Sequence, residues 1–218
     1  MIRIVAISDT HGQHELLAVP DGDILVHAGD LTLDGVLDDV RSFNAFLGRL
    51  PHRHKLVIAG NHDWCFEREP ARAAALLTNA TYLCDSAATI AGLRCYGTPW
   101  TPLFHDWAFM LPPGPALRAK WDLIPAGVDL LLTHGPPRGH GDRTIRGADA
   151  GCADLLAALD RVRPPLHVFG HIHEGRGVTF RGPTACVNAS ICTFRGQPLN
   201  QALVFDFDEQ TKTLSREG

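Results

Sequence analysis

The amino-acid sequence predicts an α/β fold, and two observations carry this prediction. Short aliphatic runs, each followed by a Gly-rich or polar turn, alternate with segments whose apolar residues recur at helical spacing. Near the C-terminus, two further strand-like runs, 184–189 and 202–207, are joined by a turn around 196–200. Strands that alternate with helices indicate a largely parallel sheet in the first half of the chain. The C-terminal pair indicates a second sheet with antiparallel character.

Five aliphatic runs are typical of buried strands, because each is short and is bounded by turn residues. They cover residues 2–7, 24–26, 55–59, 130–132 and 167–169. Three segments predict helices that would pack on these strands. They cover residues 38–50, 71–77 and 152–162, and the first and last are followed by prolines.

Two stretches fit neither pattern. Residues 97–115 are rich in Pro and aromatic side chains, and residues 136–151 are rich in Gly, Arg and Asp. Long irregular loops in a compact domain are often functional. Because the 218 residues contain no internal repeat and no flexible linker, we predict that residues 1–218 form a single domain.

The composition narrows the classes of partner. A formal net charge of −4 argues against a broad basic surface for long nucleic acid or an anionic membrane. The sequence has no recognisable signal peptide and no apolar run long enough to span a bilayer, so we expect a cytoplasmic protein. The six cysteines form no C-x-x-C pair, and we expect them to be reduced and mostly buried.

The turns that follow the five predicted strands carry side chains that bind metal ions. In chain order they supply Asp9 and His11, then Asp30, then Asn61, His62 and Asp63, then His134, and finally His171 and His173. Ligands collect at the carboxyl ends of strands in open α/β sheets, so these turns are expected to converge. Carboxylate and imidazole together suit Mn, Fe or Zn better than Mg. Each motif alone is a weak signal, because a turn or a helix cap can also explain it. The 60–63 motif is sharper, since a plain turn does not require Asn, His and Asp together.

The five motifs together resemble the calcineurin-like metallophosphoesterase superfamily, in its order and over roughly residues 1–190. The stretches GTPWTPLF, GCADLL and HVFGHIHEG further resemble its metallophosphoesterase-domain-containing (MPPED-like) branch. The resemblance implies a four-layer α/β/β/α sandwich of two mixed sheets. It also implies two transition metals, divalent or trivalent, drawn from Mn, Fe or Zn.

Site roles follow from the same resemblance, residue by residue. It implies that one metal is held by Asp9, His11, Asp30 and His173, and that Asp30 bridges to a second metal held by Asn61, His134 and His171. It implies that His62 is catalytic, as a donor to the phosphate or the leaving oxygen, and that Asp63 orients it.

The expected activity is hydrolysis of a small phosphodiester, such as a cyclic nucleotide, by a metal-bridging hydroxide. Two ions ~3.5–4 Å apart acidify a shared water and clamp the phosphoryl oxygens. Trp100 is a candidate platform for a nucleobase, as are Phe104, Trp107 and Trp121, although we favour a loop-anchoring role for each. Arg143 and Arg146 are candidate phosphate contacts or solvated loop charges.

Three other functions remain open at this stage. A phosphomonoesterase or phosphoprotein phosphatase is disfavoured, since such phosphatases usually carry an Arg shortly after the bridging Asp and residues 31–35 contain none. A non-catalytic metal-binding scaffold would be expected to lack ligand residues, and none is lost. A nuclease is disfavoured by the negative charge. The oligomeric state is not predicted.

Overall fold

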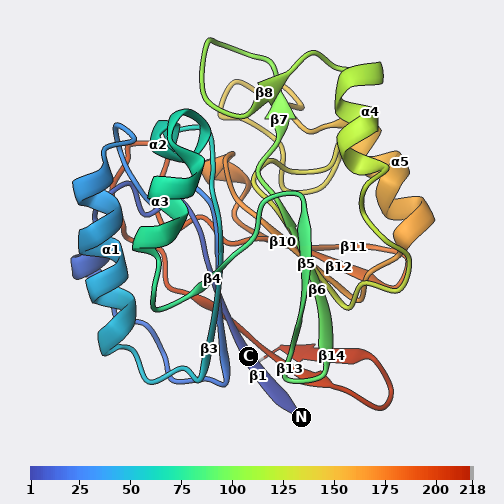
Figure 1. The fold of residues 1–218 in the computed structure, drawn as a ribbon. Coiled ribbons are helices and arrows are strands. Elements are labelled where there is room, and N and C mark those ends of the chain that lie inside the picture. The colour runs from blue at the N-terminus through green and yellow to red at the C-terminus, as the bar shows by residue number, and fades with distance from the viewer. Residues whose placement is uncertain (217–218) are drawn as a thin grey trace.

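A computed structural model describes residues 1–216, and within them two mixed six-stranded sheets pack against each other (Figure 1). The first sheet has the order β14-β13-β1-β2-β3-β4. Its strands are β1 (Ile2–Ile7), β2 (Ile24–Ala28), β3 (His54–Ile58), β4 (Thr81–Tyr82), β13 (Leu203–Asp208) and β14 (Thr213–Arg216). Strands β1 to β4 are parallel, and β13 and β14 add an antiparallel edge.

The second sheet has the order β11-β12-β10-β9-β6-β5. Its strands are β5 (Ser86–Ile90), β6 (Leu93–Thr98), β9 (Leu130–Thr133), β10 (Leu166–Phe169), β11 (Gly177–Arg181) and β12 (Thr184–Asn188). The four central strands are parallel, and β5 and β11 are antiparallel edges. A separate two-stranded pair joins β7 (Thr101–Pro102) to β8 (Met110–Leu111).

The core is divided into three parts, and this division makes the four layers. Buried aliphatic side chains of both sheets, such as Ile4, Val26, Leu132 and Val168, face each other in the central part. Helices α1 (Leu37–Arg49), α2 (Trp64–Arg68) and α3 (Pro70–Leu76) cover the outer face of the first sheet. Helices α4 (Pro115–Trp121) and α5 (Ala153–Val162) cover the second sheet on the opposite side of the molecule (Figure 1). The predicted α/β/β/α sandwich is therefore confirmed.

The central strands are continuously apolar because both faces of each sheet are covered. The burial of every residue of β2, β9 and β10 agrees with this explanation. The three predicted helices are confirmed to within about a residue at each end. Cys152 lies at the start of α5, where its Sγ accepts a hydrogen bond from the Leu155 N–H at 3.3 Å.

One prediction about the second sheet is wrong. Strands β12 and β13, which cover the runs predicted at 184–189 and 202–207, do not form an antiparallel pair in one sheet. Strand β12 lies parallel to β10 in the second sheet, whereas β13 crosses to the first sheet and pairs antiparallel with β1. The segment between β12 and β13 connects the two sheets, so it is not a hairpin turn.

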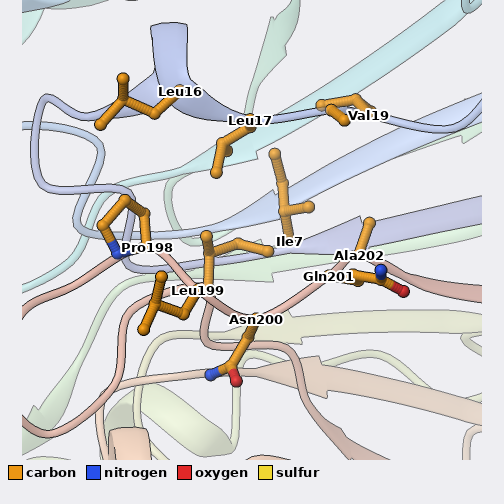
Figure 2. Close-up of a pocket in the computed structure, with 11 residues that line it drawn as sticks. Ile7, Leu16, Leu17, Val19, Pro198, Leu199, Asn200, Gln201 and Ala202 are labelled. Carbon is orange, nitrogen blue, oxygen red and sulfur yellow. The ribbon is translucent and has the colours of Figure 1, made fainter.

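A small apolar cleft of about 140 Å³ lies beside the end of β1 (Figure 2). Leu16, Leu17 and Val19 form one wall, and Pro198 and Leu199 form the other. None of the predicted metal ligands lines this cleft, so it is separate from the candidate centre described below. Across residues 1–216, we find no helix with the length and apolar character that crossing a membrane requires.

Candidate metal centre

The turns after five parallel strands bring the predicted ligands to one edge of the two sheets. Asp9 and His11 follow β1, Asp30 follows β2, Asn61 follows β3, His134 follows β9, and His171 and His173 follow β10. Three sets of side chains, one of which also includes His62, have ligand atoms that lie within 4.8 Å of one another. The sets are Asp9, His11 and His173; His11, Asp30 and His62; and Asp9, Asp30 and His134. The convergence expected from the strand ends is therefore present.

Four of these residues adopt the left-handed backbone conformation. Their φ angles are 55° at Asp9, 43° at His11, 56° at Asp30 and 68° at His171. Such a conformation costs about 1–3 kcal/mol for a non-Gly residue and is concentrated at functional sites. Backbone hydrogen bonds hold it: the Asp9 N–H donates to the Gly29 carbonyl at 2.9 Å and the His11 N–H to the Asp30 carbonyl at 3.0 Å.

Two glycines let the strand ends approach each other closely. A Cβ on Gly60 would lie 2.5 Å from the Asp30 nitrogen and 2.6 Å from Cε1 of His134. A Cβ on Gly170 would overlap Oδ2 of Asp9 and Oγ of Ser8. Both positions require Gly because a side chain would displace the neighbouring carboxylate or imidazole.

The first cluster contains Asp9, His11 and His173. Nδ1 of His173 donates to the Thr193 carbonyl at 3.0 Å, which leaves its Nε2 facing Oδ1 of Asp9 at 3.5 Å and Nε2 of His11 at 3.3 Å. The Asp9 carboxylate is fixed by the Ser190 hydroxyl at 2.6 Å and by the His171 N–H at 3.0 Å. Nδ1 of His11 is buried and has no hydrogen-bond partner within the described part of the chain.

The second cluster contains Asp30, Asn61 and His134. Nδ1 of His134 donates to the Ala28 carbonyl at 2.9 Å, so its Nε2 presents a lone pair to the cluster. That nitrogen lies 2.8 Å from Oδ1 of Asn61 and 3.3 Å from Oδ2 of Asp30, and both of these atoms are acceptors. The ring of His171 lies beside that of His134, with 5.1 Å between centroids. With His134 neutral, its Nε2 and the two oxygens are three converging acceptors, and the space between them suits a metal ion or a proton on Nε2.

A single carboxylate oxygen joins the two clusters. Oδ2 of Asp30 lies 3.9 Å from Nε2 of His11 and 3.3 Å from Nε2 of His134. The other oxygen, Oδ1, accepts the His62 N–H at 2.8 Å. Because Oδ1 is engaged by the backbone, Oδ2 is the atom oriented toward both clusters.

The protonation states also reflect converging acceptors. Burial opposes ionisation of Asp9 and Asp30, but His173 lowers the pKa of Asp9 well below its usual range and His134 does the same for Asp30. Burial disfavours the charge on His134, yet Asp30 raises its pKa to about 9. Burial lowers the pKa of His171 to about 4. The two buried carboxylates are negatively charged and stabilise positive charge on the imidazoles that face them. A set of oxygen and nitrogen donors of this kind fits Mn, Fe or Zn.

His62 is oriented by a carbonyl, which corrects the expectation that Asp63 orients it. Nδ1 of His62 donates to the Leu33 carbonyl at 2.8 Å. The buried Asp63 carboxylate instead accepts hydrogen bonds from the Thr32 hydroxyl at 2.7 Å and the Gly60 N–H at 2.8 Å, and also from the N–H groups of residues 31 and 32. Asp63 thus fixes the turn after β2 against the turn after β3.

Within residues 1–216, the tryptophan whose ring contacts His62 is Trp107, whereas the predicted Trp100 contacts Asp85 and Lys120. Nε1 of Trp100 donates to the Asp85 carboxylate at 3.0 Å, and Lys120 Nζ lies 4.2 Å from the ring centroid. The Trp107 ring, in contrast, lies 4.2 Å from the His62 ring. Nothing in the local sequence distinguishes the orientations of Trp100 and Trp107, because the fold of the loop sets them.

Arg143 and Arg146 lie exposed on the loop between β9 and α5. This loop contacts the segment that follows His173, since the Ile145 N–H donates to Oε1 of Glu174 at 2.7 Å. The two arginines therefore belong to a loop near the centre. No contact with a site residue is seen for either within residues 1–216. Ser190 and the Thr193 carbonyl, which support the first cluster, were missed because their role depends on the fold.

Comparisons with known proteins agree with this geometry. The family model for calcineurin-like phosphoesterase matches residues 2–175. Metallophosphoesterase domain-containing protein 1 of Homo sapiens is 46% identical over 229 residues, which span 94% of this chain and 70% of the relative.

Solved structures share the fold at low sequence identity. The protein TT1561 of Thermus thermophilus gives a TM-score of 0.63 at 18% identity, covering 100% of this chain and 98% of that chain. A novel archaeal phosphodiesterase gives 0.51 at 16%, covering 99% of each chain. The family match, the human relative and the two clusters lead to one conclusion: the chain belongs to the calcineurin-like phosphoesterase family of metal-dependent phosphoester hydrolases.

Proposed function

We propose that this protein is a dinuclear metal-dependent phosphodiesterase that hydrolyses small phosphodiesters such as cyclic nucleotides. The observation that carries the proposal is the pair of clusters that share Oδ2 of Asp30. Hydrolysis of a diester requires that charge be stabilised on the attacking and on the leaving oxygen, and two adjoining metal sites suit both tasks.

The ligand assignment follows the two clusters. Asp9, His11 and His173 would hold one ion, Asn61, His134 and His171 would hold the other, and Asp30 would be shared between the two sites. Bound as a pair, Mn, Fe or Zn ions lower the pKa of a coordinated water and neutralise the phosphoryl oxygens. The two carboxylates contribute two negative charges, so two divalent ions leave a positive site that attracts a phosphate anion.

His62 supplies the proton in this proposal. Its Nδ1–H is engaged by the Leu33 carbonyl, and Nε2 is the ring nitrogen available to the substrate. Protonated at Nε2, His62 donates to the oxygen of the departing alcohol, a role worth ~10²–10⁴ in rate. Asp63 acts as a positioning residue, because it holds the two turns that carry Asp30 and His62.

The substrate contacts in the proposal are Arg143 and Arg146. Arg143 and Arg146 lie on a loop that contacts Glu174, next to the ligand His173. Arginine suits bidentate recognition of a phosphate or a ribose edge. The fold likeness to an archaeal phosphodiesterase is consistent with diester hydrolysis.

The remaining parts of the proposal concern the chain as a whole. We take residues 1–218 as one metallophosphoesterase domain that acts in the cytoplasm on a small phosphoester. All six cysteines are free thiols, which fits a reducing compartment. Cell fractionation with an antibody against the chain tests the location, and recovery in a membrane or secreted fraction would contradict it.

The decisive experiment compares diesters with monoesters. The protein loaded with Mn²⁺, Fe²⁺ or Zn²⁺ is assayed on cyclic nucleotides, aryl phosphodiesters and the matching monoesters. Asn61→Ala is the test variant, and Leu103→Ala, at an exposed position, is the control. We expect diester turnover to exceed monoester turnover and to fall at least ~10²-fold in Asn61→Ala. A preference for monoesters would indicate a phosphomonoesterase or phosphoprotein phosphatase. A protein without bound transition metal or turnover would be a scaffold.

A further inference from the structure

The ring of His62 is enclosed on three sides. Its Nδ1 donates to the Leu33 carbonyl at 2.8 Å, and the ring of His11 meets it edge-on with 4.6 Å between centroids. The third contact is the Trp107 ring, at 4.2 Å and an interplanar angle of 45°. The His62 ring therefore contacts two rings, those of His11 and Trp107.

Trp107 belongs to a loop whose base is fixed to the same turn that carries His62. The next residue, Ala108, donates its N–H to the Asn61 carbonyl at 3.1 Å, and the Phe109 N–H donates to Oε1 of Glu67 at 2.8 Å. Strands β7 and β8 close the loop (Figure 1). Trp107 is therefore held at a fixed distance from the backbone of the metal-binding turn.

The rest of the loop contrasts with Trp107. Phe104 and His105, at the tip, are exposed, with 77% of Phe104 accessible to solvent. Trp107 is half-buried, and Ala108 and Phe109 are buried in the core beneath α2. The Trp100 ring meets Phe109 edge-on at 5.6 Å and supports this buried base from behind. The packing decreases toward the tip, and Trp107 is the last packed residue before it.

We propose that Trp107 is a positioning residue that fixes the ring of His62 for proton delivery to the leaving oxygen. This inference rests on the proposed function. In the step concerned, the attacking water oxygen forms a bond to phosphorus and the bond from phosphorus to the leaving oxygen breaks. The Nε2 proton of His62 passes to that oxygen, and the proton of the attacking water is released to solvent. Without the Trp107 contact the ring can rotate about its Nδ1 hydrogen bond and lose alignment.

The test is the dependence of turnover on the leaving group. Methyl aryl phosphodiesters from 4-nitrophenol to phenol are compared, because a good leaving group needs no proton and a poor one does. We expect Trp107→Ala to lower kcat about 10-fold to 100-fold for the phenyl diester, with little change for the 4-nitrophenyl diester and in KM. Trp107→Phe, which keeps an aromatic ring, should restore most of the phenyl activity.

His62→Ala and the double variant complete the test. His62→Ala should show the same leaving-group dependence, and adding Trp107→Ala to it should cause little further loss, because both act on one proton. Leu103→Ala, at an exposed position of the same loop, is the matched control and should behave as the unmodified protein. Metal content and thermal unfolding are measured for each variant.

The outcomes separate the two proposals. If Trp107→Ala lowers kcat equally for every leaving group, or its effect adds fully to that of His62→Ala, the positioning role of Trp107 is overturned. If His62→Ala itself shows no leaving-group dependence while activity still requires Asn61, the acid role of His62 fails and the Trp107 inference fails with it. If Asn61→Ala retains full activity, the proposed function is overturned.

Discussion

At the scale of single residues, the hydrogen bond made by Nδ1 determines which nitrogen of each histidine is free to bind a cation or a substrate. In His62, His134 and His173 the Nδ1–H donates to a backbone carbonyl. The backbone therefore fixes the tautomer and leaves Nε2 of each ring for a cation or a substrate. His62 lies in the same region as the ligands but on its outer side, against Trp107.

This difference predicts that metal content and activity separate in two variants. His134→Ala removes a nitrogen that faces Asp30 and Asn61, so we expect bound metal to fall from about two ions to one per chain, with loss of turnover. His62→Ala should retain both ions and lose ~10²–10⁴ in turnover of poor leaving groups. Elemental analysis of the desalted proteins checks both. Loss of an ion in His62→Ala would make His62 a ligand, which its distance from Asp30 also allows.

Gly60 gives a second prediction at this scale. Gly60→Ala introduces a methyl group against the Asp30 nitrogen and Cε1 of His134, so the strand ends must separate. We expect a loss of about 1–3 kcal/mol in the free energy of unfolding and about 10-fold to 100-fold weaker metal binding. Urea unfolding and metal titration measure the two effects. The control is Gly48→Ala on α1, whose methyl group meets the movable Asn79 side chain, and equal loss of metal affinity there would contradict the explanation.

The ligand types and their order were readable from the sequence, but the supporting groups were not. Asp9, His11, Asp30 and the later ligands stand directly after aliphatic runs, and strand ends of parallel sheets converge. Ser190 and the carbonyls of Leu33 and Thr193 are distant in sequence from the side chains they support. No local periodicity encodes such contacts, because they depend on which loops the fold places together.

At the scale of elements, the buried imidazole of His167 on β10 leads us to expect that the stability of the fold falls at acid pH. Nε2 of His167 lies 2.8 Å from the Thr133 hydroxyl, which itself donates to the Gly135 carbonyl, so His167 is the donor there. Its Nδ1 is buried without a partner among residues 1–216, and burial lowers the pKa of His167 to about 3. The unfolded chain therefore takes up the proton first as the pH falls below about 6.5.

The pH dependence of unfolding tests this element. The stability contributed by neutral His167 is fully present above pH 6.5 and is lost as the pH falls toward about 3. At pH 5 the loss is about 2 kcal/mol. Because Gln can donate to the Thr133 hydroxyl but does not titrate, His167→Gln should lose about 2 kcal/mol less than the unmodified chain between pH 7.5 and pH 5. Urea unfolding in chelator measures this, and parallel curves for the two proteins would contradict it.

Most strands buried on both faces were predicted, but the buried strand β6 and the edge strands β4, β5, β11 and β14 were not. Strands β1, β2, β3, β9 and β10 are short aliphatic runs and were recognisable. The edge strand β5 alternates between half-buried and exposed residues, and most of β11 is exposed, so neither has an apolar run. The sheet that β13 joins depends on which strand it pairs with, and the local sequence pattern does not specify that partner.

At the scale of the whole molecule, the candidate ligands come from both sheets. Asp9, Asp30 and Asn61 follow strands of the first sheet, and His134 and His173 follow strands of the second. Bound ions therefore connect the two inner layers at one edge, in addition to the apolar core between them. Metal binding and folding are coupled in such an arrangement.

Chelation should consequently lower the thermal stability of the whole domain. A ligand at a thousand times its dissociation constant stabilises the folded state by about 4 kcal/mol, and 1 kcal/mol shifts Tm by ~2–4 °C in a domain of this size. We expect removal of the ions to lower Tm on the order of 10 °C, measured by calorimetry with and without chelator. Restoring Mn²⁺ should restore Tm, and Asn61→Ala should show a smaller shift. An unchanged Tm would indicate that no ions connect the sheets.

The left-handed backbone at Asp9, His11, Asp30 and His171 has an evolutionary consequence. Glycine and asparagine fit this conformation readily, yet glycine cannot coordinate a metal and asparagine lacks the charge of Asp and the imidazole of His. Selection for heat tolerance alone would therefore drive these positions toward residues that abolish the reaction. The left-handed backbone at these positions thus sets stability against the metal-binding side chains that the proposed reaction needs.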